Sequence, residues 1–116
     1  PFQTVFRTAA QNVELDGVRL AADEKVLLSL AAANHDPRKW ENPDKFDITR
    51  KSAGHVGFGA GIHGCAGQMM ARLEIEVLLN ELARRVDRIE RDGEIEYALN
   101  NTTRGLSRLP VRIFAA

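Results

Sequence analysis

The sequence predicts an α+β chain in which short β-hairpins flank a long loop and one long helix. Two Asp-Gly pairs, at residues 16–17 and 92–93, stand beside short β-leaning runs and indicate tight turns. Apolar residues recur at three- and four-residue steps from about residue 66 to 86, as in a helix. The chain has 116 residues, the size of one small domain or of part of a larger one.

The N-terminal third favours strands. Residues 4–10 are β-leaning, and "NVELDGVRL" places two short alternating runs about Asp16-Gly17, the pattern of a two-residue type I′ hairpin. The following "EKVLLSLAAAN" fits a buried strand that runs into a short helical turn. So short an apolar run does not decide between strand and helix.

A long loop is expected between His35 and Gly61. This stretch is rich in Pro, Asp, Asn and Gly and has no sustained period. Single turns are expected after Asp36 and Asn42, where the next residue in each case is a proline suited to a first turn. Loops of this length inside domains are uncommon and are usually functional.

The predicted helix, residues 66–86, has apolar and polar positions at helical spacing. Its apolar positions are Met70, Leu73, Val77 and Leu78, and its polar stripe is Arg72, Glu76, Asn80 and Arg84. The first half is apolar on more than one face, which predicts a well-buried helix and a modest core. After residue 93 the chain alternates weakly and is expected to form hairpin strands, with "NNTTRG" at the tip of a loop.

Composition excludes several classes of partner. Sixteen basic residues balance sixteen acidic ones, so no overall field favours nucleic acid or an anionic membrane. No apolar run has the length of a membrane span, and the first residues lack the features of a signal peptide. The single cysteine agrees with a reducing compartment, so a cytoplasmic location is expected. The chain begins at Pro1, which suggests processing or a piece cut from a longer protein.

That single cysteine, Cys65, stands just before the predicted helix. The unpaired N–H groups and the dipole at a helix N-terminus favour a thiolate there. Glycines surround the thiol at positions 57, 59, 61, 64 and 67. Because they carry no side chains, they allow unusual backbone angles and the close approach of something large and flat.

Four general readings of this cysteine can be weighed. A zinc site needs about four ligands, and only His63 is near. A Cys–His hydrolase needs an imidazole that faces the sulfur, which is not expected of a residue two positions away on a glycine loop. Gly59, Gly61 and Gly64 match a nucleotide-binding fingerprint, but no strand-helix-strand unit is evident. A buried core cysteine is the fourth reading.

The whole stretch "FGAGIHGCAG", residues 58–67, resembles the haem-binding signature of the cytochrome P450 monooxygenases. "ANHDPRKWENPDKFDITR" is similar to the family's meander, "MARLEIEVLLNELARR" to the helix after the haem loop, and "FRTAAQNVELDGVRL" to the strand and hairpin beside the haem edge. The resemblance implies the proximal, C-terminal part of that mainly helical fold. Its parts would be an edge strand and hairpin, a meander and haem loop, a proximal helix and a C-terminal hairpin, over residues 1–33, 34–65, 66–87 and 88–116.

The resemblance implies roles for single residues. Cys65 would be the axial thiolate of haem b, in a loop that includes Gly59 and Gly61, and Phe58 would shield the sulfur unless it is a plain core aromatic. Main-chain amides would hydrogen-bond the sulfur, and two basic side chains would bind the haem propionates unless they are merely solvated. The amides are those of Ala66, Gly67 and Gln68, and the basic side chains are those of Arg7 and His63.

Contacts with substrate and partner are implied as well. The substrate contacts would be Phe2, Val5, Thr102 and Thr103, which otherwise would belong to a core or a solvated turn. Arg72 would face an acidic ferredoxin, or would form an ordinary pair with Glu76.

The implied reaction is insertion of one oxygen atom from dioxygen into a small aromatic substrate, with electrons from NAD(P)H through a ferredoxin. "PFQTVFRT", "KSAGHVGFG" and "NNTTRGL" resemble soluble bacterial members that oxidise para-substituted benzoates. The family's Glu-x-x-Arg helix and distal helix are not in this sequence, and Lys45 stands where the family often has an arginine. A non-catalytic haem-binding or structural module is the alternative.

By themselves, the 116 residues are expected to be inactive and to hold haem weakly or not at all. The apolar surface of the predicted helix, which includes Met69, Leu73 and Val77, would then be exposed. Large exposed apolar patches mark interfaces, so self-association through this helix or the adjoining strands is expected.

Overall fold

The computed structural model describes residues 2–116, whose elements fall into two units. Of the described residues, the first unit comprises 2–57 and 100–104, and the second comprises 58–99 and 105–116. Strands and helix occur together in both units, in agreement with the α+β class that the sequence predicts. No helix of the described residues is long and apolar enough to cross a membrane.

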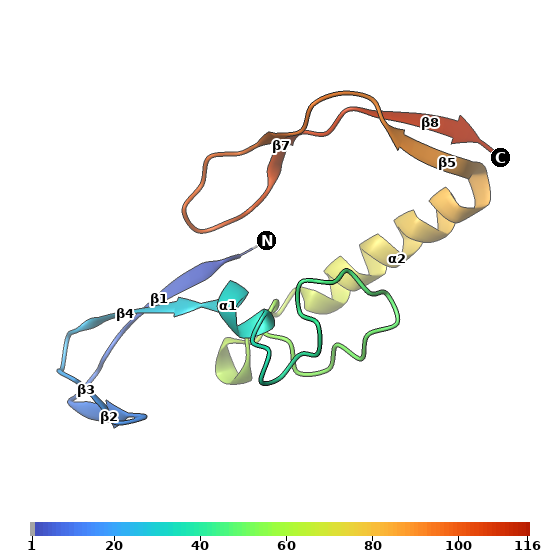
Figure 1. The fold of residues 1–116 in the computed structure, drawn as a ribbon. Coiled ribbons are helices and arrows are strands. Elements are labelled where there is room, and N and C mark those ends of the chain that lie inside the picture. Colours follow the sequence, from blue (N-terminus) through green and yellow to red (C-terminus); the bar gives the residue numbers. More distant parts are fainter. Residues whose placement is uncertain (1) are drawn as a thin grey trace. The chain divides into compact units, whose positions relative to one another are not determined.

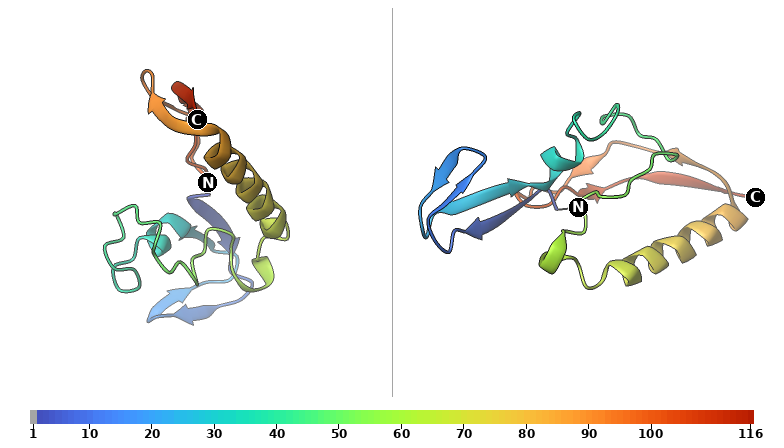
Figure 2. Two further views of the ribbon diagram at one scale, coloured as in Figure 1. Left: turned by 90° about the vertical axis from the view of Figure 1, so that its right-hand side faces the viewer. Right: turned by 90° about the horizontal axis from the view of Figure 1, so that it is seen from below.

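The first unit begins with an antiparallel ribbon of β1 (Thr4–Thr8) and β4 (Lys25–Ser29). A hairpin of β2 (Val13–Leu15) and β3 (Val18–Leu20) lies at one end of that ribbon (Figures 1 and 2). Between them, Asp16 has φ +50° and Gly17 has φ +79°, the pair of positive values that a type I′ turn requires. The predicted hairpin is confirmed.

The ambiguous "EKVLLSLAAAN" turns out to contain both elements. It forms β4 and then one helical turn, α1 (Leu30–Asn34). Ser29 makes the change of structure possible, since its Oγ accepts the N–H of Ala32 at 3.2 Å and caps the new helix. The main chain of Ala31 also donates to the carbonyl of Gln3 at 3.1 Å, which ties α1 to the start of β1.

The loop after α1 contains both predicted turns. The N–H groups of Lys39 and Trp40 donate to the carbonyl of Asp36 at 3.0 and 2.9 Å, and that of Lys45 donates to the carbonyl of Asn42 at 3.0 Å. Trp40 is 8% exposed and is the one side chain classed as buried in the described part of the chain. The expected core is therefore confined to the packing around this indole.

The second unit is built on α2 (Gln68–Arg85), which continues directly into β5 (Val86–Arg91; Figure 1). β5 pairs with β8 (Val111–Ala115), and β6 (Glu96–Tyr97) pairs with β7 (Leu106–Arg108). The C-terminal strands are confirmed, but the expectation of a helix through residue 86 or 87 overlooks β5. "VDRIER" lacks a clean alternation, and it becomes a strand through its pairing with β8.

The helix α2 is exposed in this chain, as expected for the 116 residues by themselves, although its apolar pattern is typical of a buried helix. None of the described α2 residues is buried, and Met69, Leu73 and Val77 are 72%, 57% and 56% exposed. A helix that is apolar on several faces needs partners on each of them. Within its own unit α2 contacts β5, a strand that continues from its C-terminus, so its apolar faces are exposed.

Candidate functional site

The cysteine loop, residues 58–67, leads into the N-terminus of α2. The N–H of Cys65 donates to the carbonyl of Phe58 at 2.8 Å, which closes the loop on itself. The thiol is exposed. The reading of Cys65 as a buried core residue is therefore wrong for this structure, because the side chain faces solvent at the loop's end.

Glycines allow the loop to turn so tightly. Gly59 has φ +76°, and a Cβ built on it would lie 2.5 Å from the carbonyl oxygen of His63. Gly61 has φ +56° and begins a 3-10 turn, Gly61–His63. Any other residue at Gly59 would be strained in φ and would overlap main-chain atoms. The chain thus brings two of its own segments together with no side chain between them.

The start of α2 lies beside the sulfur. Gly67 is the N-cap residue, and a Cβ built on it would lie 3.9 Å from the sulfur of Cys65. The N–H of Gln68 donates to the carbonyl of Cys65 at 3.3 Å, and that of Ala71 donates to Gly67 at 3.0 Å. The first N–H groups of a helix have no acceptor within it and carry positive partial charge. The main chain at this end of α2 therefore presents positive partial charge beside the sulfur.

Phe58 is half-buried at the other end of the loop. The guanidinium carbon of Arg72, in the second turn of α2, lies over its ring at 5.2 Å from the centroid. Phe58 therefore contacts the helix through its side chain and the cysteine through its carbonyl.

The side chains that could act as ligands indicate which kind of metal group the site could bind. Among residues 2–116 there is no cluster of three or more His, Cys, Asp or Glu side chains able to hold a metal ion. A zinc site of protein ligands is therefore unsupported. One exposed thiol in a glycine-rich loop fits a metal whose other donors come with it, as in a haem.

The two candidate propionate ligands belong to different units. Arg7 lies on β1 opposite Val26, is exposed, and donates from Nη1 to the carbonyl of Phe6 at 2.7 Å. His63 ends the 3-10 turn of the cysteine loop and is exposed. Both side chains are accessible to a carboxylate, and their roles stay predictions.

The candidate substrate contacts come together within the first unit. Phe2 forms a β-bridge with Thr103, and the N–H of Gln3 donates to the carbonyl of Thr102 at 2.7 Å. Val5 follows on β1. Residues about 100 positions apart in sequence thus share one small surface, although none of these contacts tests binding of a substrate.

Sequence reasoning missed two residues that organise the loop after α1. Trp40 donates from Nε1 to the carbonyl of Ala33 at 3.0 Å. Arg50 donates to three main-chain carbonyls, those of Glu41, Asn42 (2.8 Å) and Lys45 (3.1 Å). A lone tryptophan in a polar segment was the available signal, whereas an arginine that binds carbonyls leaves no pattern in the sequence.

Two aspartates stabilise the same loop. A side-chain hydrogen bond from Arg38 lowers the pKa of Asp36 to about 2, with Arg38 Nη2 at 2.6 Å from the carboxylate. The side-chain hydrogen bond from Thr49 Oγ1, at 2.6 Å, lowers the pKa of Asp47. Both carboxylates accept main-chain N–H groups two residues on, which is the Asx-turn geometry.

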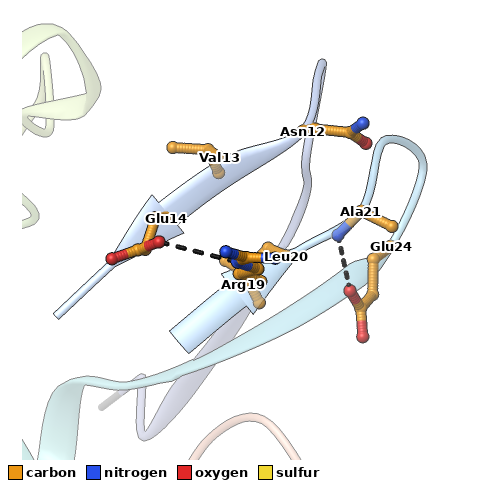
Figure 3. Close-up of a pocket in the computed structure, with 7 residues that line it drawn as sticks. All are labelled: Asn12, Val13, Glu14, Arg19, Leu20, Ala21 and Glu24. Carbon is orange, nitrogen blue, oxygen red and sulfur yellow. Dashed lines mark hydrogen bonds and ion pairs between the residues drawn. The ribbon is translucent and has the colours of Figure 1, made fainter. Parts of the chain in front are cut away.

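A shallow hollow beside the β2–β3 hairpin has a structural explanation (Figure 3). Glu24 accepts the N–H of Ala21 at 2.9 Å, and Asn12 accepts the N–H of Ala22 at 2.8 Å. Across the hairpin, Arg19 pairs with Glu14 at 3.7 Å. These polar side chains hold the turn between β3 and β4, so the hollow gives no indication of chemistry.

Comparison with known proteins identifies the family. The family model described as Cytochrome P450 matches residues 1–113. The chain is 53% identical over all 116 residues to cytochrome p450 CYP199A2 of Rhodopseudomonas palustris and 34% identical to cytochrome P450-terp of a Pseudomonas species. It covers 28% and 27% of those two proteins.

Solved structures show the same fold. The crystal structure of CYP108D1 from Novosphingobium aromaticivorans superimposes with a TM-score of 0.94 at 45% identity, over 100% of this chain and 28% of that one. P450BioI, crystallised with an acyl carrier protein that bears hexadec-9Z-enoic acid, gives 0.93 at 38% identity, over 98% and 30%. The chain thus spans less than a third of these relatives' length. The fold, the cysteine loop and the match over residues 1–113 together show that the chain belongs to the cytochrome P450 family.

Proposed function

We propose that this chain forms the proximal part of a haem-thiolate monooxygenase, with Cys65 as the axial ligand of haem b. The observation that carries the proposal is the exposed thiol of Cys65, held beside the N-terminus of α2 in a loop that Gly59 allows to close tightly. Haem bound through a thiolate supplies activation of dioxygen, because electron donation from sulfur favours cleavage of the O–O bond.

The chain's own residues bind and tune that group. Gly59 and Gly61 keep the loop thin, and the amides of Ala66, Gly67 and Gln68 place positive partial charge near the sulfur. Phe58 excludes water from one side of the loop. Arg7 and His63 donate hydrogen bonds to the haem propionates, which as charge-assisted bonds are stronger than neutral ones.

Phe2, Val5, Thr102 and Thr103 contact a small aromatic substrate, which receives one oxygen atom from dioxygen. The bridge between Phe2 and Thr103 supports this, because it joins two segments of the expected recognition surface. The family alone does not select a substrate, since its members include a beta-dihydromenaquinone-9 omega-hydroxylase and a 6-deoxyerythronolide B hydroxylase. The resemblance to enzymes that oxidise para-substituted benzoates favours aromatic acids.

Electrons come from NAD(P)H through a reductase and an acidic ferredoxin. Arg72 is exposed near the N-terminus of α2, where a cation can pair with a carboxylate of that partner. The balanced charge and the single cysteine support a cytoplasmic location.

The substitution Cys65→His tests the ligand in the haem-loaded parent enzyme. The wild type should show the long-wavelength carbon monoxide band of a thiolate-ligated ferrous haem. The variant should show an imidazole-type band and lose oxygenation, because neutral imidazole donates less charge to iron. A thiolate-type band that persists in Cys65→His would overturn the assignment.

Haem loss tests the propionate ligands. Arg7→Ala and His63→Ala should each speed transfer of haem to an excess of an acceptor protein, since each removes a charge-assisted bond. Arg19→Ala is the control, because Arg19 is an exposed arginine on the β2–β3 hairpin that pairs with Glu14. Haem loss that is unchanged in both variants would remove the proposed role.

For the 116 residues by themselves we propose weak or absent haem binding, no oxygenation, and self-association through residues 66–86 or the adjoining strands. Met69, Leu73 and Val77 are all more than half exposed, and contiguous apolar surface of this kind marks an interface. Sedimentation equilibrium combined with a haem assay tests this. A stable monomer that carries one tightly held haem would refute it.

A further inference from the structure

The segment Asn100–Arg104, here called the tip, belongs to the same unit as the start of the chain. The N–H of Gln3 donates to the carbonyl of Thr102 at 2.7 Å, and Phe2 forms a β-bridge with Thr103. No helix or strand spans the tip itself. The tip therefore carries two of the proposed substrate contacts and is tied to a third, but its own shape must come from other bonds.

One side-chain oxygen, Oδ1 of Asn100, supplies those bonds. It accepts the N–H of Thr102, the N–H of Thr103 and the hydroxyl of Thr102, each at 2.9 Å. Main-chain N–H groups can only donate, so the atom that faces them must be the oxygen of the amide group, and the hydroxyl must be the third donor. Asparagine oxygens that bind N–H groups two or three residues on hold a turn in one conformation.

We propose that Asn100 is a positioning residue that holds Thr102 and Thr103 in the arrangement that binds substrate. This inference rests on the proposed function, in which those two threonines contact the substrate. Asn100 is exposed, whereas Thr102 and Thr103 are half-buried, so Asn100 acts through the shape of the tip. It decides how the two threonines face the segment that begins with Phe2.

Loss of this acceptor should weaken substrate binding through the population of the ordered tip. The measured affinity of a ligand falls in proportion to the fraction of protein whose site is in the binding conformation. A neutral hydrogen bond shifts an equilibrium by about twofold to tenfold. The bond from Gln3 and the bridge from Phe2 do not involve the Asn100 side chain, so the tip should loosen without leaving the start of the chain.

The test is a calorimetric titration of the haem-loaded parent enzyme with 4-methylbenzoate, a para-substituted benzoate. Asn100→Ala should raise the Kd about twofold to tenfold. Asn100→Ser should restore part of the affinity, because its hydroxyl oxygen can accept the same N–H groups more weakly and adds no charge near an anionic probe. Asn101→Ala is the matched control, since the bond from Thr4 Oγ1 at 3.3 Å goes to the main-chain carbonyl of Asn101, which the substitution retains.

Amide hydrogen exchange of the peptide that contains the tip, measured without ligand, shows how Asn100 acts. Exchange should be faster in Asn100→Ala than in the wild type and unchanged in Asn101→Ala. Faster exchange with a wild-type Kd would mean a structural role alone and would overturn the inference, as would a wild-type result in both measurements. A raised Kd with wild-type exchange would also overturn it, because Asn100 would then act without ordering the tip. A wild-type enzyme that does not bind 4-methylbenzoate would instead refute the proposed substrate class, so the two failures are distinguishable.

Discussion

Gly59 is the position where one added methyl group should damage the cysteine loop most. Its φ of +76° costs an L-residue about 1–2 kcal/mol. In Gly59→Ala, the new Cβ would lie 2.5 Å from the carbonyl oxygen of His63, against 3.4 Å for an ordinary contact, so the two atoms must separate by about 0.9 Å. Because the obstacle is backbone, relief moves the loop, at a further cost of about 1–3 kcal/mol.

Two other glycines of the loop separate the cost of the strained φ from the cost of the steric overlap. At Gly61 the φ of +56° is strained for an alanine, but a Cβ would have no atom within 4 Å. Gly61→Ala should therefore lower the free energy of unfolding by the cost of the strained φ alone. Gly67 carries no such strained φ, and its Cβ would meet only the sulfur at an ordinary 3.9 Å, so Gly67→Ala should be close to neutral. The expected order of destabilisation is therefore Gly59, Gly61, Gly67.

Urea denaturation and haem-transfer rates, measured on the three variants made in the haem-loaded parent enzyme, check this order. Gly59→Ala should lower the free energy of unfolding most and should also release haem fastest, because the displaced backbone leads directly to the ligand. If Gly59→Ala and Gly61→Ala were equally stable, the overlap with His63 would contribute nothing and the account of the loop would be wrong.

The remaining predictions concern the loop after α1. Trp40→Ala should cost about 3–5 kcal/mol and Trp40→Phe, which loses the bond to Ala33, about 1 kcal/mol, both read from urea midpoints. The lowered pKa of Asp36 gives stability that is full above pH 3.8 and is lost as pH falls toward 2. Asp36→Asn should flatten acid unfolding in this range, measured as the loss of native signal against pH.

Short-range features of the fold could be predicted from the sequence because each is determined by neighbouring residues. Asp16-Gly17 supplies two positive φ values by itself, and the two proline turns depend on residues within a few positions. β5 could not be predicted in this way. Its residues 86–91 pair with residues 111–115, so the state of the segment is decided by a strand that lies about 25 residues away.

The apolar pattern of α2 does not by itself determine burial, and the exposure expected for the 116 residues follows from missing packing partners. Periodicity reports which faces of a helix are apolar, and that reading agrees with the residues found. Whether those faces are covered depends on what packs against them. The chain spans 28% of its relative from Rhodopseudomonas palustris, and Met69, Leu73 and Val77 are exposed. The same apolar pattern is therefore compatible with a buried helix in a longer protein and with an exposed one here.

The candidate site contains features fixed by neighbouring residues and features fixed by long-range contacts. Its parts therefore differ in how well the sequence predicts them. The cysteine loop is local, since the bond from Cys65 to Phe58 and the close approach of Gly59 to His63 all arise within eight residues. The surface of Phe2 and Thr103 is not, because it depends on a bridge between the two ends of the chain. The proposed metal ligand therefore depends on a short local motif, whereas the proposed substrate contacts depend on a long-range bridge.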